Sequence, residues 1–234
     1  MKRFLLAGAT LLALTLAQPT LAADAPIYKG PAPVAAALFN WSSFYLGISG
    51  GWARAETAWT NTGTGIGTGN FTGDGGLIGG TIGWNWQAPG SALVLGVEGD
   101  WSWANVQANQ ASIAPFFCGG APAGCHAKLE SLATFRGRLG WANGAFLLYA
   151  MAGGAWGQIR NFEDALFDSR VSQTGWTAGG GIEVAVAGNW SVKGEYLYMA
   201  FPQSGAFFIT GGGNPLVHDY YRLHIFRVGA NVRF

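Results

Sequence analysis

Few residues in this sequence are of types and spacings that support covalent chemistry. The segment Gly47-Ile48-Ser49-Gly50-Gly51 matches the G-x-S-x-G string, in which a serine on a sharp strand-to-helix turn acts as a nucleophile. Here the string lies inside a continuous alternating segment instead of such a turn, and His224 is the one histidine expected near the depth of Ser49. Because 38 glycines make such a string common by composition alone, we expect no catalytic residues and no enzyme.

Two cysteines, Cys118 and Cys125, enclose the short sequence GGAPAG. In an exported chain this spacing favours a local disulfide. A metal site would need more ligands than His126, which is the only imidazole nearby. Neither a G-x-G-x-x-G string nor a P-loop occurs. We therefore expect a disulfide in this segment, and no metal and no cofactor anywhere in the chain.

The N-terminus carries an export signal. Lys2 and Arg3 precede an apolar run from Phe4 to Ala17, and small residues follow up to Ala22. This pattern predicts a signal peptide over 1–22, since the run is shorter than the roughly 20 residues needed to span a bilayer. Residues 23–40 are rich in proline and alanine and are predicted to be a flexible leader, and 41–234 suffices for one all-β domain.

The charges exclude a nucleic-acid-binding protein. Loss of Lys2 and Arg3 with the signal leaves 11 basic residues against 12 acidic ones. Such a chain has no basic field to attract a polyanion. Half of the residues are hydrophobic, yet no uninterrupted apolar stretch after the signal is long enough for a membrane helix.

Strict alternation of apolar and polar residues predicts strands. In the clearest one, Leu95 and Val97 alternate with Gly96, Glu98 and Asp100. The segment around 146–156 is apolar on both faces, so its register stays open. The eight expected strands are 43–52, 78–87, 93–103, 128–141, 146–156, 176–186, 190–198 and 221–234.

The connections between these strands alternate in length. Short turns with glycine or asparagine are expected at 88–91, 142–144 and 187–189. Four long connections are expected at 57–73, 105–125, 158–173 and 201–219. This order predicts an antiparallel up-and-down β-barrel of eight strands, with four long loops at one end and three short turns at the other.

Charged residues of both signs fall on the face opposite the large apolar residues. A soluble sandwich would expose this face to water, whereas a barrel in a membrane would enclose it and let opposite charges pair. The charge pattern alone permits both arrangements. The residues are Glu98, Asp100, Lys128, Glu130, Arg136, Arg138, Glu183, Lys193, Glu195, Arg227 and Arg233.

Tryptophan separates the two arrangements. Eight tryptophans lie on the apolar faces near strand ends, with aliphatic residues between them, as in the aromatic girdles of a transmembrane barrel. A sandwich core buries one or two such rings. The four beside the short turns are Trp84, Trp86, Trp141 and Trp190, and the four beside the long loops are Trp52, Trp101, Trp103 and Trp176.

Several segments resemble the small outer-membrane β-barrel family of Gram-negative bacteria, in particular the alphaproteobacterial surface proteins often labelled "porin family". The segments are NWSSFYLGISGGW, LATFRGRLGWA, GWTAGGGIEVAVAGNWSVKGEYLYM and HIFRVGANVRF. The resemblance implies the cell outer membrane as the location, with turns in the periplasm and loops outside. It also implies a C-terminal signal for the barrel assembly machinery, carried here by Arg227, Gly229, Val232 and Phe234.

These features lead us to expect a structural and surface-display role. An eight-stranded barrel is just wide enough to be filled by its own side chains, so the "porin" label does not imply a diffusion pore. The expected partners are outer-membrane lipid and lipopolysaccharide, the assembly machinery, and a surface ligand or host partner. We expect the chain to be a monomer and a surface antigen. Two alternatives remain open: hemin binding through His126 or His218, which the resemblance suggests, and a narrow ion path along the charged face.

Overall fold

The computed structural model describes residues 39–111, 124–163, 167–202 and 216–234, and the predicted signal peptide and most of the leader lie outside these ranges. Every regular element in these ranges is a strand. The described residues therefore contain no helix long and apolar enough to cross a membrane. The strands are β1 (Ser43–Asn61), β2 (Phe71–Gln87), β3 (Leu93–Ala111), β4 (Gly124–Asn143), β5 (Phe146–Glu163), β6 (Phe167–Ala187), β7 (Trp190–Phe201) and β8 (Leu216–Arg233).

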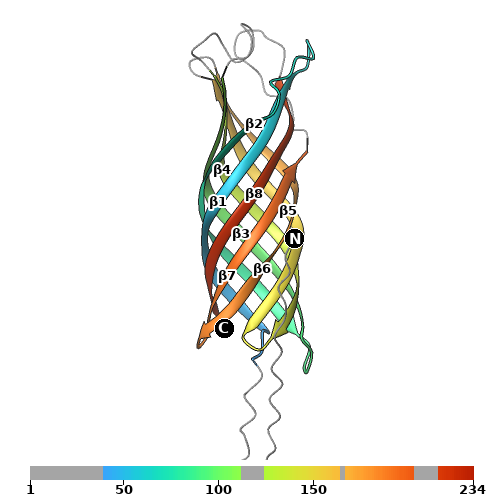
Figure 1. The fold of residues 1–234 in the computed structure, drawn as a ribbon, viewed down its shortest axis with the longest axis vertical. Coiled ribbons are helices and arrows are strands. Elements are labelled where there is room, and N and C mark those ends of the chain that lie inside the picture. Colours follow the sequence, from blue (N-terminus) through green and yellow to red (C-terminus); the bar gives the residue numbers. More distant parts are fainter. Residues whose placement is uncertain (1–38, 112–123, 164–166, 203–215) are drawn as a thin grey trace, which may run out of the picture. The chain divides into compact units, whose positions relative to one another are not determined.

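The eight strands form a closed antiparallel barrel in sequence order (Figure 1). Each strand pairs with the next, and β8 returns to pair with β1 along a seam that runs from Tyr45 opposite Arg233 to Asn61 opposite Leu216. Closure leaves no open sheet edge through the middle of the barrel. Toward the loop end, the described part of β6 before Trp176 pairs with β5 alone. The predicted fold class is confirmed.

Short turns join β2 to β3, β4 to β5 and β6 to β7, and we call this end of the barrel the turn end. Each turn contains one glycine in the left-handed region: Gly90, Gly144 and Gly188, with φ of 72°, 58° and 53°. A Cβ would strain the backbone at these positions. The opposite end is called the loop end.

The strands extend farther toward the loop end than the alternation predicts. Residues 158–173 were expected to form a loop, yet β5 continues to Glu163 and β6 begins at Phe167. The other three predicted loops shorten in the same way, since β1 reaches Asn61, β3 reaches Ala111 and β8 begins at Leu216. The predicted boundaries were wrong because the side-chain pattern changes there.

From the turn end to the middle of the barrel, large apolar residues point outward. Phe44, Ile48 and Ile78 are exposed by 64%, 71% and 65%, while polar residues between them point inward. The register of β5, which the sequence left open, places Leu147 inside and Leu148 outside. This arrangement suits a barrel whose surroundings are apolar.

At the loop end this pattern reverses. Ala53 and Ile159 are fully buried inside, whereas the neighbouring Arg54 and Arg170 point outward and Arg160 is partly exposed. An apolar inside with a charged outside is typical of a strand that faces water. The alternation of the sequence therefore persists, but with the two faces exchanged.

A β-bulge in β4 contributes to this reversal. Leu129 pairs with Ile159 and Ser131 with Gln158, so Glu130 is the extra residue. A bulge of one residue turns all side chains beyond it to the other face. Leu129 is consequently buried, and Lys128 and Glu130 lie outside the barrel instead of in its lumen, where the uninterrupted alternation had placed them.

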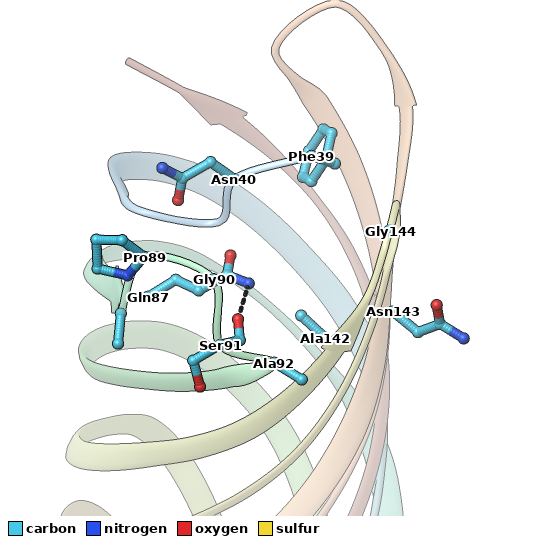
Figure 2. A pocket seen from close by; sticks show the side chains of 11 residues that line it. Phe39, Asn40, Gln87, Pro89, Gly90, Ser91, Ala92, Ala142, Asn143 and Gly144 are labelled. Carbon is cyan, nitrogen blue, oxygen red and sulfur yellow. Dashed lines mark hydrogen bonds between the residues drawn. The ribbon is translucent and has the colours of Figure 1, made fainter. Parts of the chain in front are cut away.

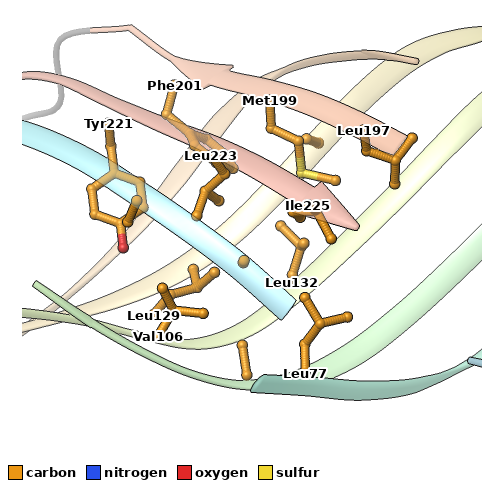
Figure 3. Packing of buried hydrophobic residues seen from close by; sticks show 14 of the residues in the cluster. Leu77, Val106, Leu129, Leu132, Leu197, Met199, Phe201, Tyr221, Leu223 and Ile225 are labelled. Atoms are coloured by element: carbon orange, nitrogen blue, oxygen red, sulfur yellow. The ribbon is translucent and has the colours of Figure 1, made fainter. Parts of the chain in front are cut away.

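The lumen near the loop end is filled by apolar side chains (Figure 3), which we call the apolar lumen core. Those labelled there come from β2, β3, β4, β7 and β8 and meet across the barrel axis, and β1 and β5 add residues such as Ala53 and Ile159. Trp59 and Phe71 add an edge-to-face ring pair with centroids 5.4 Å apart. The residues labelled in Figure 3 are Leu77, Val106, Leu129, Leu132, Leu197, Met199, Phe201, Tyr221, Leu223 and Ile225.

Two adjacent glycines of β1 allow a test of the closing seam. A Cβ at Gly51 would lie 2.2 Å from the carbonyl oxygen of Phe226 in β8, whereas a Cβ at the outward Gly50 would lie 3.7 Å from its nearest neighbour. We expect Gly51→Ala to lower the free energy of unfolding in detergent by about 1 to 3 kcal/mol through overpacking. Gly50→Ala should leave it unchanged.

The measurement is the fraction of protein that keeps the heat-modifiable, fast-migrating form in unboiled gels as urea is raised. Equal urea midpoints for Gly51→Ala and Gly50→Ala would show that the backbone at the seam is not as closely packed as described.

Candidate functional site

Eight buried ionisable side chains meet in the lumen, and we call them the lumen ion cluster. They project from β3, β4, β6, β7 and β8, and along each strand they lie between the turn end and the apolar lumen core. Four are carboxylates and four are cations, so their formal charges cancel. The members are Glu98, Asp100, Glu183, Glu195, Arg136, Arg138, Lys193 and Arg227, each 7% exposed or less.

Glu98 on β3 is the hub of this cluster. Lys193 Nζ on β7 donates to Glu98 Oε2 at 2.9 Å, and the Tyr45 hydroxyl on β1 donates to the same oxygen at 2.8 Å. Arg136 forms a hydrogen-bonded ion pair with Glu98 Oε1. Ion pairs at 3.6 Å to Arg138 and Arg227 complete its contacts. The Glu98 carboxylate thus joins β3 to side chains of four other strands, β1, β4, β7 and β8.

Arg227 connects the closing strand to the far wall. Its Nε donates to Glu195 on the neighbouring β7 at 2.5 Å, and its Nη1 donates across the lumen to Asp100 on β3 at 3.2 Å. Asp100 also accepts from Thr134 at 2.5 Å. The Tyr149 hydroxyl donates to Glu195 at 2.6 Å. The carboxylates on β3 and β7 are therefore bound from several sides.

Glu183 on β6 anchors the part of the cluster nearest the turn end. It accepts hydrogen bonds from Arg138 at 2.8 Å, from Ser191 at 2.6 Å and from Asn231 at 2.8 Å. The Arg138 guanidinium also lies 3.8 Å from the centroid of the Tyr149 ring. Charge-assisted hydrogen bonds and cation–π contacts of this kind offset the cost of removing the charges from water.

The cluster fits inside a narrow barrel because β1 and β2 present small residues to the lumen. Gly47, Ser49 and Gly51 face inward on β1, and Gly79 and Gly83 face inward on β2. A Cβ at Gly83 would lie 2.2 Å from the Tyr45 ring. The long cationic side chains in the lumen come instead from β4, β7 and β8.

The turn end is closed by Trp41, which precedes β1 and is fully buried. Its Nε1 donates to the carbonyl oxygen of Gly144 at 3.1 Å, and its backbone N–H donates to Gln87 at 2.9 Å. Arg233 lies over the rings of Phe39 and Trp41, at 4.2 and 5.1 Å.

Beside Trp41, the segment 39–40 and two turns line a small open pocket of about 290 Å³ (Figure 2). Pro89, Ser91 and Asn143 are among its lining residues. No ionisable or nucleophilic pair lies in it. The pocket is a gap between turns, and its residues do not form a catalytic or metal-binding arrangement.

The hypothetical nucleophile and base lie on opposite faces of the barrel wall. Ser49 is buried in the lumen, whereas His224 points outward and its Nδ1 lies 2.8 Å from the Tyr196 hydroxyl. A serine and a histidine separated by the sheet cannot exchange a proton. The G-x-S-x-G string is therefore part of a strand and not a nucleophile elbow.

The two candidate hemin ligands were expected in loops, but both lie in strands. His126 is on β4, where its ring stacks on Phe162 with centroids 4.8 Å apart and its Nδ1 lies 2.7 Å from Asn109 Oδ1. His218 is on β8, opposite Trp59. The strands β4 and β8 are on opposite sides of the ring of strands, so the two positions are not neighbours in the sheet.

Two further sets of predicted residues have different outcomes. Cys118 lies outside the described residues, so its disulfide with Cys125 stays a prediction. Of the proposed assembly signal, Arg227 joins the lumen ion cluster, and Val232 and Phe234 lie on the outer face, with Phe234 exposed by 75%. At Gly229 a Cβ would lie 2.8 Å from the carbonyl oxygen of Ile48 across the seam.

A family model described as the outer membrane protein beta-barrel domain matches residues 9–234, which is nearly the whole chain. The chain belongs to this family. It is 29% identical over 251 residues to the "31 kDa outer-membrane immunogenic protein" of Brucella melitensis, and the alignment covers 100% of both chains. It is 27% identical over 195 residues to the "22 kDa outer membrane protein" of Rhizobium leguminosarum, covering 83% of this chain and 79% of that one.

Among solved structures, the outer membrane protein OprG of Pseudomonas aeruginosa has a similar fold, with a TM-score of 0.54 and 13% sequence identity over 84% of this chain and 99% of that chain. The fold, the family and these relatives together place the chain in the cell outer membrane. That the turn end faces the periplasm stays an expectation from the family resemblance.

In this outer-membrane barrel, the structure places all eight predicted girdle tryptophans on the outer face, with exposures from 40% to 62%. Trp156 on β5 is also outward, with 49% of its surface exposed, and the sequence did not reveal it because the register of β5 was open. Indole rings prefer the interface between lipid and headgroups. The outward residues are Trp52, Trp84, Trp86, Trp101, Trp103, Trp141, Trp156, Trp176 and Trp190.

The lumen ion cluster and a surface ion pair offer a matched test of buried charge. Glu98→Gln leaves four cations facing three carboxylates in the closed lumen of this outer-membrane barrel. We expect it to lower the free energy of unfolding by about 3 to 5 kcal/mol, because buried charges lose their compensation. The measurement is urea unfolding of the detergent-folded protein, followed by tryptophan fluorescence.

Glu130→Gln is the control. It removes the same charge from an exposed pair with Arg170, 3.0 Å apart, and should change the free energy by less than about 1 kcal/mol. Similar losses for the two variants would mean that the cluster is solvated and not buried.

Proposed function

We propose that this chain is a non-conducting structural barrel that contributes to the integrity of the outer membrane and displays its loop end outside the cell. The observation that carries the proposal is the filled lumen. A general diffusion channel needs a wider barrel with a water-filled interior, as in porins of 16 to 18 strands.

Three successive layers obstruct the path through the lumen. Trp41 covers the turn end, where it is hydrogen-bonded to Gly144. The lumen ion cluster follows, and its ion pairs bridge the walls from β3 to β7 and β8. The apolar lumen core lies beyond it, toward the loop end. An ion moving along the axis would have to break the pairs of the second layer and cross an apolar third layer.

The display of the loop end is supported by the length of the strands. On β6, Phe167 is nine positions from Trp176, and on β1, Asn61 is nine positions from Trp52. At about 3.3 Å per residue and a tilt of about 40°, the sheet continues roughly 20 Å beyond the outer tryptophans. The word "immunogenic" in the names of the Brucella relatives agrees with an accessible surface.

Conductance measurements test the closed lumen. Folded protein inserted into planar bilayers should give no reproducible current steps, under conditions in which a porin of 16 strands does. The leading competing function is a narrow ion path through the cluster. Reproducible steps in the wild-type protein, with a size that changes on Arg136→Ala, would establish that path and overturn the proposal.

A further inference from the structure

We infer that the outer face of β4, β5 and β6 binds the phosphorylated headgroup of an outer-leaflet glycolipid. The inference depends on the outer-membrane location of the chain and not on whether its lumen conducts. It would explain an arrangement of charges on this face that is unfavourable for the protein alone.

Three cations form a row across these strands, and we call it the cation row. Lys128 on β4 is directly opposite Arg160 on β5, which is directly opposite Arg170 on β6. All three are on the outer face, since the residues that flank them point inward. Like charges directly opposite one another in a sheet destabilise it. An anion bound along the row would relieve this repulsion.

The carboxylates beside the cation row compensate it only in part. Asp168 accepts two hydrogen bonds from Arg160, at 2.8 and 2.6 Å, and Glu130 accepts one from Arg170 at 3.0 Å. Both pairs are partly exposed, so each contributes little and can exchange for a stronger anion. Lys128 makes no ion pair with the described side chains. Among the side chains that the structure describes, three cations against two carboxylates leave the patch a net charge of +1.

An aromatic surface continues the patch toward the loop end. Phe162 follows Arg160 on the same face of β5, and the Arg160 guanidinium lies 5.3 Å from the centroid of its ring. His126 stacks on the same ring with an interplanar angle of 16°. Flat rings suit the C–H face of a sugar, and arginines suit phosphate oxygens. The combination fits a phosphorylated sugar better than a simple phosphate ion.

The height of the cation row matches a headgroup. Arg160 is four residues beyond Trp156 on β5. With about 3.3 Å per residue and a tilt of about 40°, the row lies roughly 10 Å outside the level of that indole. This height is at the outer edge of the polar layer that covers the hydrocarbon core of a membrane. A glycolipid anchored there presents its phosphates at the side of the barrel.

The seam side of the barrel offers a contrast. There Arg54 on β1 faces Asp74 on β2, and Glu56 on β1 faces Arg222 on β8, so opposite charges alternate. A comparable number of outward charges therefore forms no uniform row. This face supplies a matched control.

The experiment measures binding of diphosphoryl lipid A to the mature chain folded in uncharged detergent, by native mass spectrometry. Wild type should bind it, and Lys128→Gln/Arg170→Gln should weaken the affinity by about tenfold or more. Arg54→Gln/Arg222→Gln, with the same change in charge, should keep the wild-type affinity. Heat-modifiable mobility verifies that each variant is folded, and Lys128→Gln alone is used should the double variant fail to fold.

Three results would overturn the inference. The first is equal affinity of wild type and the row variant for diphosphoryl lipid A. The second is equal binding of dephosphorylated lipid A, which would show that acyl chains alone are recognised. The third is complete competition by inorganic phosphate at millimolar concentration, which would identify a site for the free anion and not for a lipid headgroup.

Discussion

Every backbone N–H and C=O of a strand inside a bilayer must find its partner within the protein, and the pairing of β8 with β1 is what meets this requirement. The rest of the structure depends on that closure. A closed sheet of eight strands leaves a lumen only as wide as a few side chains, so each charge that faces inward is shut away from water and must be paired there. Arg227 contributes both to the closure of the barrel and to the pairing of charges in the lumen, because it lies on the closing strand and binds carboxylates on β7 and β3.

The surroundings of the barrel change along its axis, and the side chains change with them. Where lipid lies outside, apolar residues such as Ile48 face outward and charged residues face inward. Beyond the outer tryptophans hydrated headgroups and water lie outside, so residues such as Arg170 face outward and Ile159 faces inward. The first part behaves as a transmembrane barrel and the second as a water-soluble one. This exchange explains how one continuous sheet can both cross a membrane and support an exposed surface.

The membrane-facing part of the fold could be predicted from the sequence because its rule is local. A period of two with apolar residues on one face identified the strands, and glycine or asparagine identified the turns at Gly90, Gly144 and Gly188. The strand ends at the loop end could not be predicted in the same way. There the outer face meets water and the lumen is apolar, so the sequence no longer shows the apolar-out, polar-in alternation that identified the strands. The position of the bulge at Glu130 depends on pairing with β3 and β5, and the residues next to Glu130 in the sequence do not predict it. The sequence likewise grouped the charged residues by face, but the partners of Glu98 come from four other strands and follow only from the closed fold.

The most direct test of this account measures the accessibility of nitroxide labels on the outer face of β5. The labels are placed at Leu148, Ala152, Trp156 and Arg160. The protein has its two cysteines replaced by serine and is reconstituted in lipid. The account predicts that labels at Leu148 and Ala152 collide mainly with oxygen dissolved in lipid, and that the label at Arg160 collides mainly with a water-soluble relaxation agent, with the change near Trp156. Equal exposure to lipid at Ala152 and Arg160 would contradict it, because the exchange of the two faces would then not mark the edge of the membrane.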